Sequence, residues 1–175
     1  MTSTHIRSVV AGHEAGVLAE LGASTFRETF GHLYQAQDLA AFLAHKHTVA
    51  EYEQLIADPA AAVWIVEDGD GSAVGYATAK PCDLPVPNLP PRSGELQRLY
   101  LRREFQGAGI GRRLLAIVLD WLTERFDAIY LSVYQDNHGA QRLYRSHGFE
   151  VVHEYHFMVG DHADPEYIMG RVAGS

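Results

Sequence analysis

The sequence predicts an α/β (α+β) protein that forms a single domain over residues 1–175, with helices flanking a central sheet. Three observations lead to this fold class. The 175 residues are 47% hydrophobic and 21% charged, which suits one soluble domain with a sizeable core. Runs of β-forming residues alternate with stretches of helical periodicity. In the second half, a strand, a glycine turn, a helix and another strand follow one another, which is a βαβ unit.

In the first half, a short strand is expected over residues 6–10 and a helix over 13–33. Apolar residues at 39, 42 and 43 mark a second helix, and a third spans 49–57 before Pro59. The runs AAVWIVED and AVGYATAK then flank the turn GDGS, which predicts a β-hairpin. PCDLPVPNLPPRSG carries five prolines in fourteen residues. It is therefore a loop, although one too short to divide the chain into domains.

The second half alternates clearly between strands and helices. GELQRLYL predicts a strand, 111–126 a helix, AIYLSVY a strand and 137–148 a second helix. The runs FEVVHEYHFMV and EYIMGRV predict two more strands, separated by the polar turn GDHADP. The helix over 111–126 has an apolar face at spacings of three and four, formed by Leu114, Leu115, Val118, Trp121 and Leu122.

Charge and cysteine content exclude several classes of protein. The formal net charge is −8, which argues against general nucleic-acid binding and is compatible with a cationic substrate. Cys82 is the only cysteine, so neither an internal disulfide nor a Cys/His zinc site can form. The sequence shows no secretory signal and no run of about 18 apolar residues. A cytoplasmic protein without a membrane partner is therefore expected.

The stretch EFQGAGIGRR, residues 104–113, lies where a strand leads into a helix N-terminus. Free N–H groups and the helix dipole favour an anion there. The spacing excludes a Walker A loop, which needs GK followed by Ser or Thr, and a GxGxxG dinucleotide loop, because the last glycine would fall on Arg112. Arg112 and Arg113 oppose the helix dipole unless they face an anion. Two solvated surface arginines are the alternative interpretation.

Two ordered motifs resemble the GNAT N-acetyltransferase superfamily. The first matches its acyl-CoA pyrophosphate loop, Q/R-x-x-G-x-G/A, and consists of Gln106, Gly107, Ala108, Gly109, Ile110 and Gly111. The second follows about 25 residues later and matches N-x-x-A-x-x-L-Y-x-x-x-G-F, at Asn137, Ala140, Leu143, Tyr144, Gly148 and Phe149. The resemblance covers roughly residues 61–172. Four further stretches, TFRETFGHLY, GELQRLYL, EFQGAGIG and HFMVGDHADPEYIM, resemble the PaiA-type spermidine/spermine acetyltransferases.

The resemblance implies a mixed, mostly antiparallel sheet in which one parallel strand pair splays apart, with a CoA-binding core at about 93–150. It implies acetyl-CoA as co-substrate and direct transfer to an amine in a ternary complex, without a metal. Pantetheine would pair with the backbone of Leu99, Tyr100 and Leu101, and an N–H near Leu101 would stabilise the oxyanion. Gln106 to Arg112 would hold the pyrophosphate, and Asn137 and Ala140 would also contact CoA. Many relatives are dimers, so a homodimer is left open.

Two residues are the candidate catalytic groups. The family commonly places a tyrosine near the CoA sulfur, so Tyr144 is the candidate general acid, and a core tyrosine is the alternative. Glu95 opens the strand before the glycine loop and could take the amine proton, directly or through water. A surface glutamate is the alternative for Glu95, and a chain of backbone carbonyls and water is a rival base. Asn137 could also serve as a helix N-cap.

The acceptor site and any metal site have weaker signals. Glu28, His32 and Tyr34 follow or end the first helix, a region that lines the acceptor site in the family. A solvated helix end is the alternative for these three residues. The ten histidines do not form a metal pattern, because pairs such as His45 and His47, or His153 and His156, do not share one face of their elements.

The leading functional hypothesis is an acetyl-CoA-dependent amine N-acetyltransferase with a polyamine such as spermidine as the first substrate guess. A protein or peptide N-terminus, or another small amine, is the alternative substrate. Two hypotheses from other classes stay open, namely a CoA-binding sensor without turnover and a structural module that binds phosphate. The presence of Tyr144 favours the enzyme over the sensor.

Overall fold

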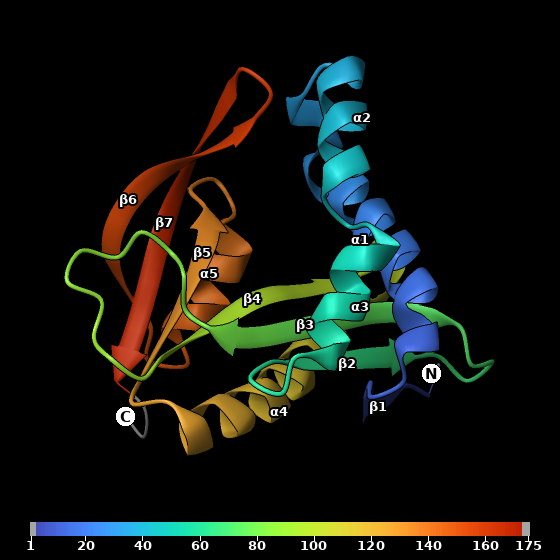
Figure 1. The fold of residues 1–175 in the computed structure, drawn as a ribbon, viewed down its shortest axis with the longest axis horizontal. Helices are drawn as coiled ribbons and strands as arrows, with labels where there is room; N and C mark the ends of the chain where they lie inside the picture. Colours follow the sequence, from blue (N-terminus) through green and yellow to red (C-terminus); the bar gives the residue numbers. More distant parts are fainter. Residues whose placement is uncertain (1–2, 173–175) are drawn as a thin grey trace.

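The computed structural model describes residues 3–172 and contains a seven-stranded sheet in the order β1-β2-β3-β4-β5-β7-β6 (Figure 1). Neighbouring strands run antiparallel except β4 and β5, which are parallel. This topology confirms the predicted fold class. The strands are β1 (His5–Ser8), β2 (Ala62–Glu67), β3 (Ala73–Pro81), β4 (Ser93–Leu101), β5 (Ala128–Tyr134), β6 (Glu150–Val159) and β7 (His162–Val172).

Helices cover both faces of the sheet. Figure 1 shows α1 and α3 over one face of β1 to β4 and α4 beneath the other face, while α2 stands beside the tip of the β6–β7 hairpin. The helices are α1 (Ala15–Phe30), α2 (Ala36–His45), α3 (Val49–Ala57), α4 (Ile110–Arg125) and α5 (His138–Arg145). Most predicted boundaries lie within a few residues of these. The predicted first helix covers α1 together with parts of two 3-10 turns, one before it and one after it.

Two apolar cores lie on opposite faces of the sheet. Along β2, Val63 and Ile65 pack with Leu18 and Leu21 of α1, whereas Trp64 and Val66 pack on the side of α4. Successive side chains of a strand point to opposite faces. The strand is buried on both faces, which explains why its sequence is a continuous apolar run rather than an alternating one.

The parallel strands β4 and β5 pair over three positions only and then diverge. Their register runs from Ser93 opposite Ala128 to Glu95 opposite Tyr130. Immediately beyond, the register of β4 against β3 shifts between Leu96 and Arg98, so that Gln97 is an extra residue on β4. A bulge of this kind bends its strand and increases the local twist. The predicted splayed pair is thereby confirmed, and the gap between β4 and β5 is visible in Figure 1.

The predicted polar turn GDHADP was wrong in extent. The structure pairs Val159 with His162, so the turn consists of Gly160 and Asp161, and β7 begins at His162. Gly160 has a φ of 58°, as two-residue hairpin turns require. The polar residues of GDHADP favoured a turn over the whole stretch. A two-residue turn instead lets β6 and β7 pair up to Val159 and His162. Asp164 consequently lies within a strand.

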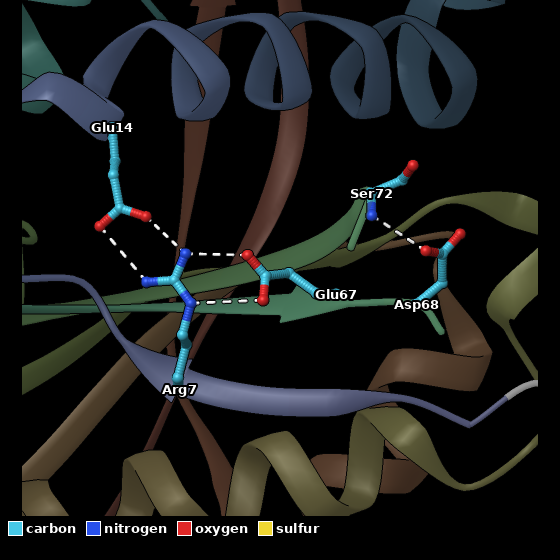
Figure 2. A network of polar contacts seen from close by, with 5 residues as sticks. All are labelled: Arg7, Glu14, Glu67, Asp68 and Ser72. Carbon is cyan, nitrogen blue, oxygen red and sulfur yellow. Dashed lines mark hydrogen bonds and ion pairs between the residues drawn. The ribbon is translucent and has the colours of Figure 1, made fainter. Parts of the chain in front are cut away.

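An ion-pair network anchors the first strand far from the splayed strands. Arg7 of β1 bonds Glu67 of β2, with 2.8 Å between Nη2 and Oε1, and also bonds Glu14 in the turn before α1 (Figure 2). The hydrogen bonds from Arg7 hold the pKa of Glu67 below its usual value. Nearby, Asp68 accepts the N–H of Ser72 at 2.9 Å and closes the β2–β3 turn. Within residues 3–172, no helix combines the length and the apolar character needed to cross a bilayer.

Candidate active site

A cavity of about 1230 Å³ occupies the gap where β4 and β5 diverge. Backbone and side chains of β4 line one wall, and Leu131 to Tyr134 of β5 line the other. One end of the cavity reaches the glycine loop and the N-terminus of α4. The lining also includes the segment between α1 and α2 and the hairpin of β6 and β7. The cavity therefore joins a site suited to an anion with a second, differently lined site.

The glycine loop has the backbone conformation that its sequence suggests. Gly107 and Gly109 have φ values of 82° and 83°, a left-handed conformation that only glycine adopts without strain. A Cβ at either position would meet no atom within 4 Å, so the backbone angle and not a lack of space requires glycine. Gly109 is the N-cap of α4. The first N–H groups of this helix therefore have no partner within the helix and are available to an anion.

The residues of this loop differ in what they present to the cavity. Gln106, Gly107, Gly109, Gly111 and Arg112 line it. Ile110 is instead buried in the apolar core, and Ala108 is exposed outside the cavity lining. The side chain of Gln106 donates to the carbonyl of Leu101 at 3.1 Å, which ties the loop to the end of β4.

The two neighbouring arginines point to different partners. Arg112 is exposed and lines the cavity. Arg113 hydrogen-bonds the hydroxyl of Thr4 at 3.2 Å, away from the cavity lining. The sequence left two interpretations open, arginines that bind an anion or arginines that are solvated at the surface. In the structure, the two residues differ in this respect. Arg112 has the position expected of an anion-binding residue, and Arg113 is bound to the surface.

The backbone of β4 alternates between β3 and the cavity. Arg102 donates its N–H to the carbonyl of Val74 on β3 at 2.8 Å. Because this pattern alternates along an antiparallel ladder, the N–H and C=O groups of Leu101 and Leu99 point away from β3, into the gap. Tyr100 directs its backbone groups toward β3 and its side chain to the cavity. The unpaired edge of β4 can therefore hydrogen-bond an extended ligand through Leu99 and Leu101.

Tyr144 of α5 lines the cavity beside Ala140 and Asn137. Burial raises the pKa of Tyr144 to about 12, so its hydroxyl keeps its proton at neutral pH. Among residues 3–172, no hydrogen-bond partner is found for this hydroxyl. Asn137 caps α5 through a bond from the N–H of Ala140 at 3.2 Å. The predicted N-cap is confirmed, and it sets the start of the helix that carries Tyr144.

Carboxylates also line the cavity, Glu95 at the closed end of the gap and Glu166 beside its open part. The lining includes Asp83, Glu95, Asp136, Asp164 and Glu166. Burial raises the pKa of Glu95 to about 7, while Lys80 and the N–H of Asp83 oppose the rise. Burial and the nearby Asp164 raise the pKa of Glu166 to about 8. Asp164 is only 2% exposed. An acidic recess of this kind favours a cationic ligand.

Sequence reasoning missed Asp164 and Glu166. Asp164 fell in the predicted turn, and Glu166 was assigned only to a strand. The spacing of Asp164, Glu166 and Ile168, two residues apart, places the three on one face of β7. That spacing was the available signal, but it shows the shared face only once the strand is known to begin at His162.

The three predicted acceptor-site residues have different surroundings. Tyr34 lines the cavity and donates its hydroxyl to Asp164 Oδ2. His32 is exposed at the cavity rim. Glu28 is not in the lining; its carboxylate accepts the N–H of Arg103 at 3.2 Å and connects α1 with the segment after β4.

Neither a metal site nor an activated thiol is apparent in this region. Among the described residues, no group of three or more His, Cys, Asp or Glu side chains is placed to hold a metal ion. Cys82 lies half-buried in the proline loop, and burial raises its pKa to about 11. A thiol with a raised pKa is a poor nucleophile at neutral pH.

Comparison with known proteins gives a consistent result. Residues 25–149 match the model of the acetyltransferase (GNAT) family. An uncharacterized N-acetyltransferase of Mycobacterium tuberculosis is 30% identical over 162 residues, which is 90% of this chain and 97% of that protein.

Among solved structures, the PaiA N-acetyltransferase of Thermoplasma acidophilum in complex with coenzyme A has a TM-score of 0.74 at 19% identity, over 97% of this chain and 99% of that one. The spermidine N-acetyltransferase of Vibrio cholerae in complex with CoA and spermine has a TM-score of 0.64 at 22% identity, over 97% and 95%.

Proposed function

The chain belongs to the GNAT acetyltransferase family, and we propose that it moves the acetyl group of acetyl-CoA directly to a primary amine of a polyamine such as spermidine. It is an acyltransferase, and acetyl-CoA is its co-substrate. The observation that carries the proposal is the continuous cavity, whose lining includes both a helix N-terminus suited to an anion and several carboxylates.

The donor binds along the glycine loop and the free edge of β4. The N–H groups at the start of α4 and the guanidinium of Arg112 suit the pyrophosphate of CoA. Pantetheine extends from there into the gap, where the backbone groups of Leu99 and the N–H of Leu101 are free to pair with its amides, while the carbonyl of Leu101 already accepts the side chain of Gln106. This arrangement brings the thioester into the gap between β4 and β5, beyond their last paired position.

Transfer requires charge stabilisation and proton movement at this point. The N–H of Leu101 stabilises the negative charge that develops on the thioester oxygen. Tyr144, with its pKa of about 12, stays protonated and gives its proton to the departing CoA thiolate. Glu95, with a pKa of about 7, is the base expected from the sequence, and Glu166 is a second carboxylate on the same cavity.

The acceptor amine is positively charged, and it therefore binds beside the carboxylates that line the cavity. Asp164 and Glu166 of β7 line the cavity with Tyr34, and Asp83 and Glu95 extend the acidic lining. A polyamine carries several ammonium groups, so one can lie at the thioester while another stays near a carboxylate. Spermine in the related Vibrio cholerae structure supports a polyamine as the first acceptor to test.

The proposal is tested by mixing purified protein with acetyl-CoA and a panel of amines while the release of CoA thiol is followed. The panel contains spermidine, spermine, a monoamine of matched length and a peptide with a free N-terminus. Thiol release that depends on spermidine or spermine is expected, with kcat/KM at least tenfold above that of the monoamine. Turnover with the peptide alone would replace the polyamine by an N-terminal acceptor. CoA binding without turnover of any amine would contradict acetyl transfer to amines of these classes.

A further inference from the structure

Glu166 lies in β7, next to the part of the sheet where β4 and β5 no longer pair. It pairs with Tyr134 of β5 and with Tyr155 of β6. Pairing of β5 with β4 ends at Tyr130, so Tyr134 lies four residues past the last paired position. Glu166 is therefore level with the gap into which the thioester extends, and it lines the cavity there.

The surroundings of Glu166 hold its carboxylate in place. Ser132 of β5 donates to Glu166 Oε2 at 3.4 Å, and the hydroxyls of Ser132 and Tyr155 are 2.7 Å apart. Burial and the charge of Asp164 raise the pKa of Glu166 to about 8, and the bond from Ser132 lowers it.

Four tyrosines on other elements lie close enough to Glu166 for its charge to act on them. These are Tyr34 after α1, Tyr100 on β4, Tyr134 on β5 and Tyr155 on β6. Burial raises the pKa of each of them, so all four are neutral phenols over the pH range in which Glu166 titrates. Asp164 on β7 is the carboxylate that acts on Glu166. A change in the ionisation of Glu166 between pH 7 and 9 is therefore not masked by these neighbours.

Glu95 occupies a different position. It pairs with Tyr130 at the last joined position of β4 and β5, the closed end of the gap. Its Oε1 accepts the N–H of Asp83 at 3.3 Å, and Lys80, which bonds Asp83 at 2.6 Å, lowers its pKa. Each carboxylate therefore accepts one hydrogen bond among the described residues, Glu95 from the proline loop and Glu166 from Ser132. The two differ in their position along the gap.

Tyr100 connects Glu166 with the candidate acid. Both Glu166 and Tyr144 raise the pKa of Tyr100 through their charges, in addition to its burial. The two groups therefore lie near the same side chain of β4, although Tyr144 packs with the core on the side of α4. An acid and a base on two sides of one strand can act on a reacting centre that lies at the strand's free edge.

We propose that Glu166 is the general base that takes the first proton from the acceptor ammonium, an inference that rests on the proposed acetyl transfer. The neutral amine then attacks the thioester carbon, so that a C–N bond forms and the C–S bond breaks. Tyr144 gives its proton to the thiolate and is reprotonated by the second nitrogen proton through solvent. Glu166 finally releases its proton, and the net products are an N-acetylated amine, CoA thiol and one proton.

The pH dependence of kcat/KM tests this assignment. In the unaltered protein, kcat/KM for the amine rises about tenfold per pH unit below pH 8 and levels off above it, because the carboxylate form of Glu166 is the active one. Glu166→Gln loses this inflection, and kcat falls about 100-fold at pH 7. Glu166→Asp retains the inflection with a lower kcat. Glu95→Gln retains it as well.

Two further variants should shift the pKa of Glu166 in opposite directions without removing its carboxylate. They keep the proposal testable if Glu166→Gln does not fold. Ser132→Ala removes a donor that lowers the pKa of Glu166, so the inflection moves to higher pH. Asp164→Asn removes a charge that raises this pKa, so the inflection moves to lower pH. In the CoA-free protein, ¹³C NMR of the glutamate carboxyls should show one group titrating near pH 8 that Glu166→Gln eliminates.

The outcomes separate this inference from the proposed function. If the unaltered protein acetylates no amine, the proposed function fails. If it turns over and Glu166→Gln keeps both its rate and its inflection, the assignment of Glu166 is overturned while the proposed function stands. Loss of the inflection in Glu95→Gln instead would identify Glu95 as the base.

Discussion

The hydroxyl of Tyr34 donates a hydrogen bond to Asp164 although the two residues are 130 positions apart in the chain. Tyr34 follows α1, and Asp164 lies in β7 beside the hairpin turn. Phe42 of α2 and Phe157 of β6 pack nearby with their ring centroids 5.8 Å apart. These contacts join the segment between α1 and α2, and α2 itself, to the β6–β7 hairpin.

Tyr34→Phe should lower the free energy of unfolding by about 1–3 kcal/mol, because a buried carboxylate loses its donor. Denaturant unfolding measures the change. Tyr134→Phe is the matched control, since it removes an exposed tyrosine–aspartate bond of 3.2 Å and should change stability by about 0.5 kcal/mol or less. An equal loss of unfolding free energy in the two variants would mean that the hydrogen bond between Tyr34 and Asp164 adds no more stability than an exposed one.

Gly109→Val should raise the dissociation constant of CoA at least tenfold, because a side chain at a φ of 83° distorts the loop that presents the N–H groups. Gly71→Val is the control. Gly71 has a φ of 82° in the β2–β3 turn and is equally uncrowded, so both variants should lose about 1–2 kcal/mol of stability. Calorimetry should find weaker CoA binding in Gly109→Val alone. Unchanged binding there would mean that the loop only turns the chain.

Arg112→Glu should weaken CoA binding about tenfold, because it places a negative charge beside the pyrophosphate at the start of α4. Arg113→Glu carries the same change of charge one residue later. Its arginine is bound to Thr4, so this variant should weaken binding much less. Binding titrations at low and high salt measure both effects, which salt should reduce. If the two variants weaken binding equally, only the net charge of the region matters.

The stability of the CoA-free protein should depend on pH through Glu166. Its folded-state pKa of about 8 lies above the unfolded value near 4.5, so the folded state binds more protons between these values. The stabilising contribution of the protonated form is complete below pH 4.5 and is lost as the pH rises through 8. Glu166→Gln should therefore be more stable than the unaltered protein at pH 9, by about 1–3 kcal/mol, relative to their difference at pH 5. Thermal unfolding at both pH values measures this, and a difference that is independent of pH would contradict the burial of a titrating Glu166.

The sequence was sufficient for the fold. Strand and helix periodicity located the elements, and the paired motifs around Gly109 and Tyr144 predict where CoA binds, in segments that line one cavity. These features are local in sequence, because a glycine turn, a helix N-terminus and a single helix face each lie within a few residues.

The acidic part of the cavity was predicted only in part, because tertiary contacts assemble it: Tyr34 and Glu95 were among the candidates, whereas Asp164 and Glu166 were not. Tyr34, Glu95 and Glu166 come from three distant segments, and no spacing in the sequence links them. The interpretation of GDHADP as a turn further concealed Asp164, whose polar neighbours obscured the strand. The raised pKa of Glu166 depends on burial and on the charge of Asp164, and neither can be read from residues 160–172 alone.

Acetyl transfer in this cavity with Tyr144 as the general acid is tested most directly by single-turnover measurements on Tyr144→Phe. Tyr130→Phe is the control, since Tyr130 is outside the cavity lining. Spermidine-dependent release of CoA should slow about 100-fold in Tyr144→Phe, while the dissociation constant of CoA stays unchanged. Tyr130→Phe should react at the unaltered rate. Release of CoA that is equally fast in Tyr144→Phe, or that does not depend on the amine, would contradict this mechanism.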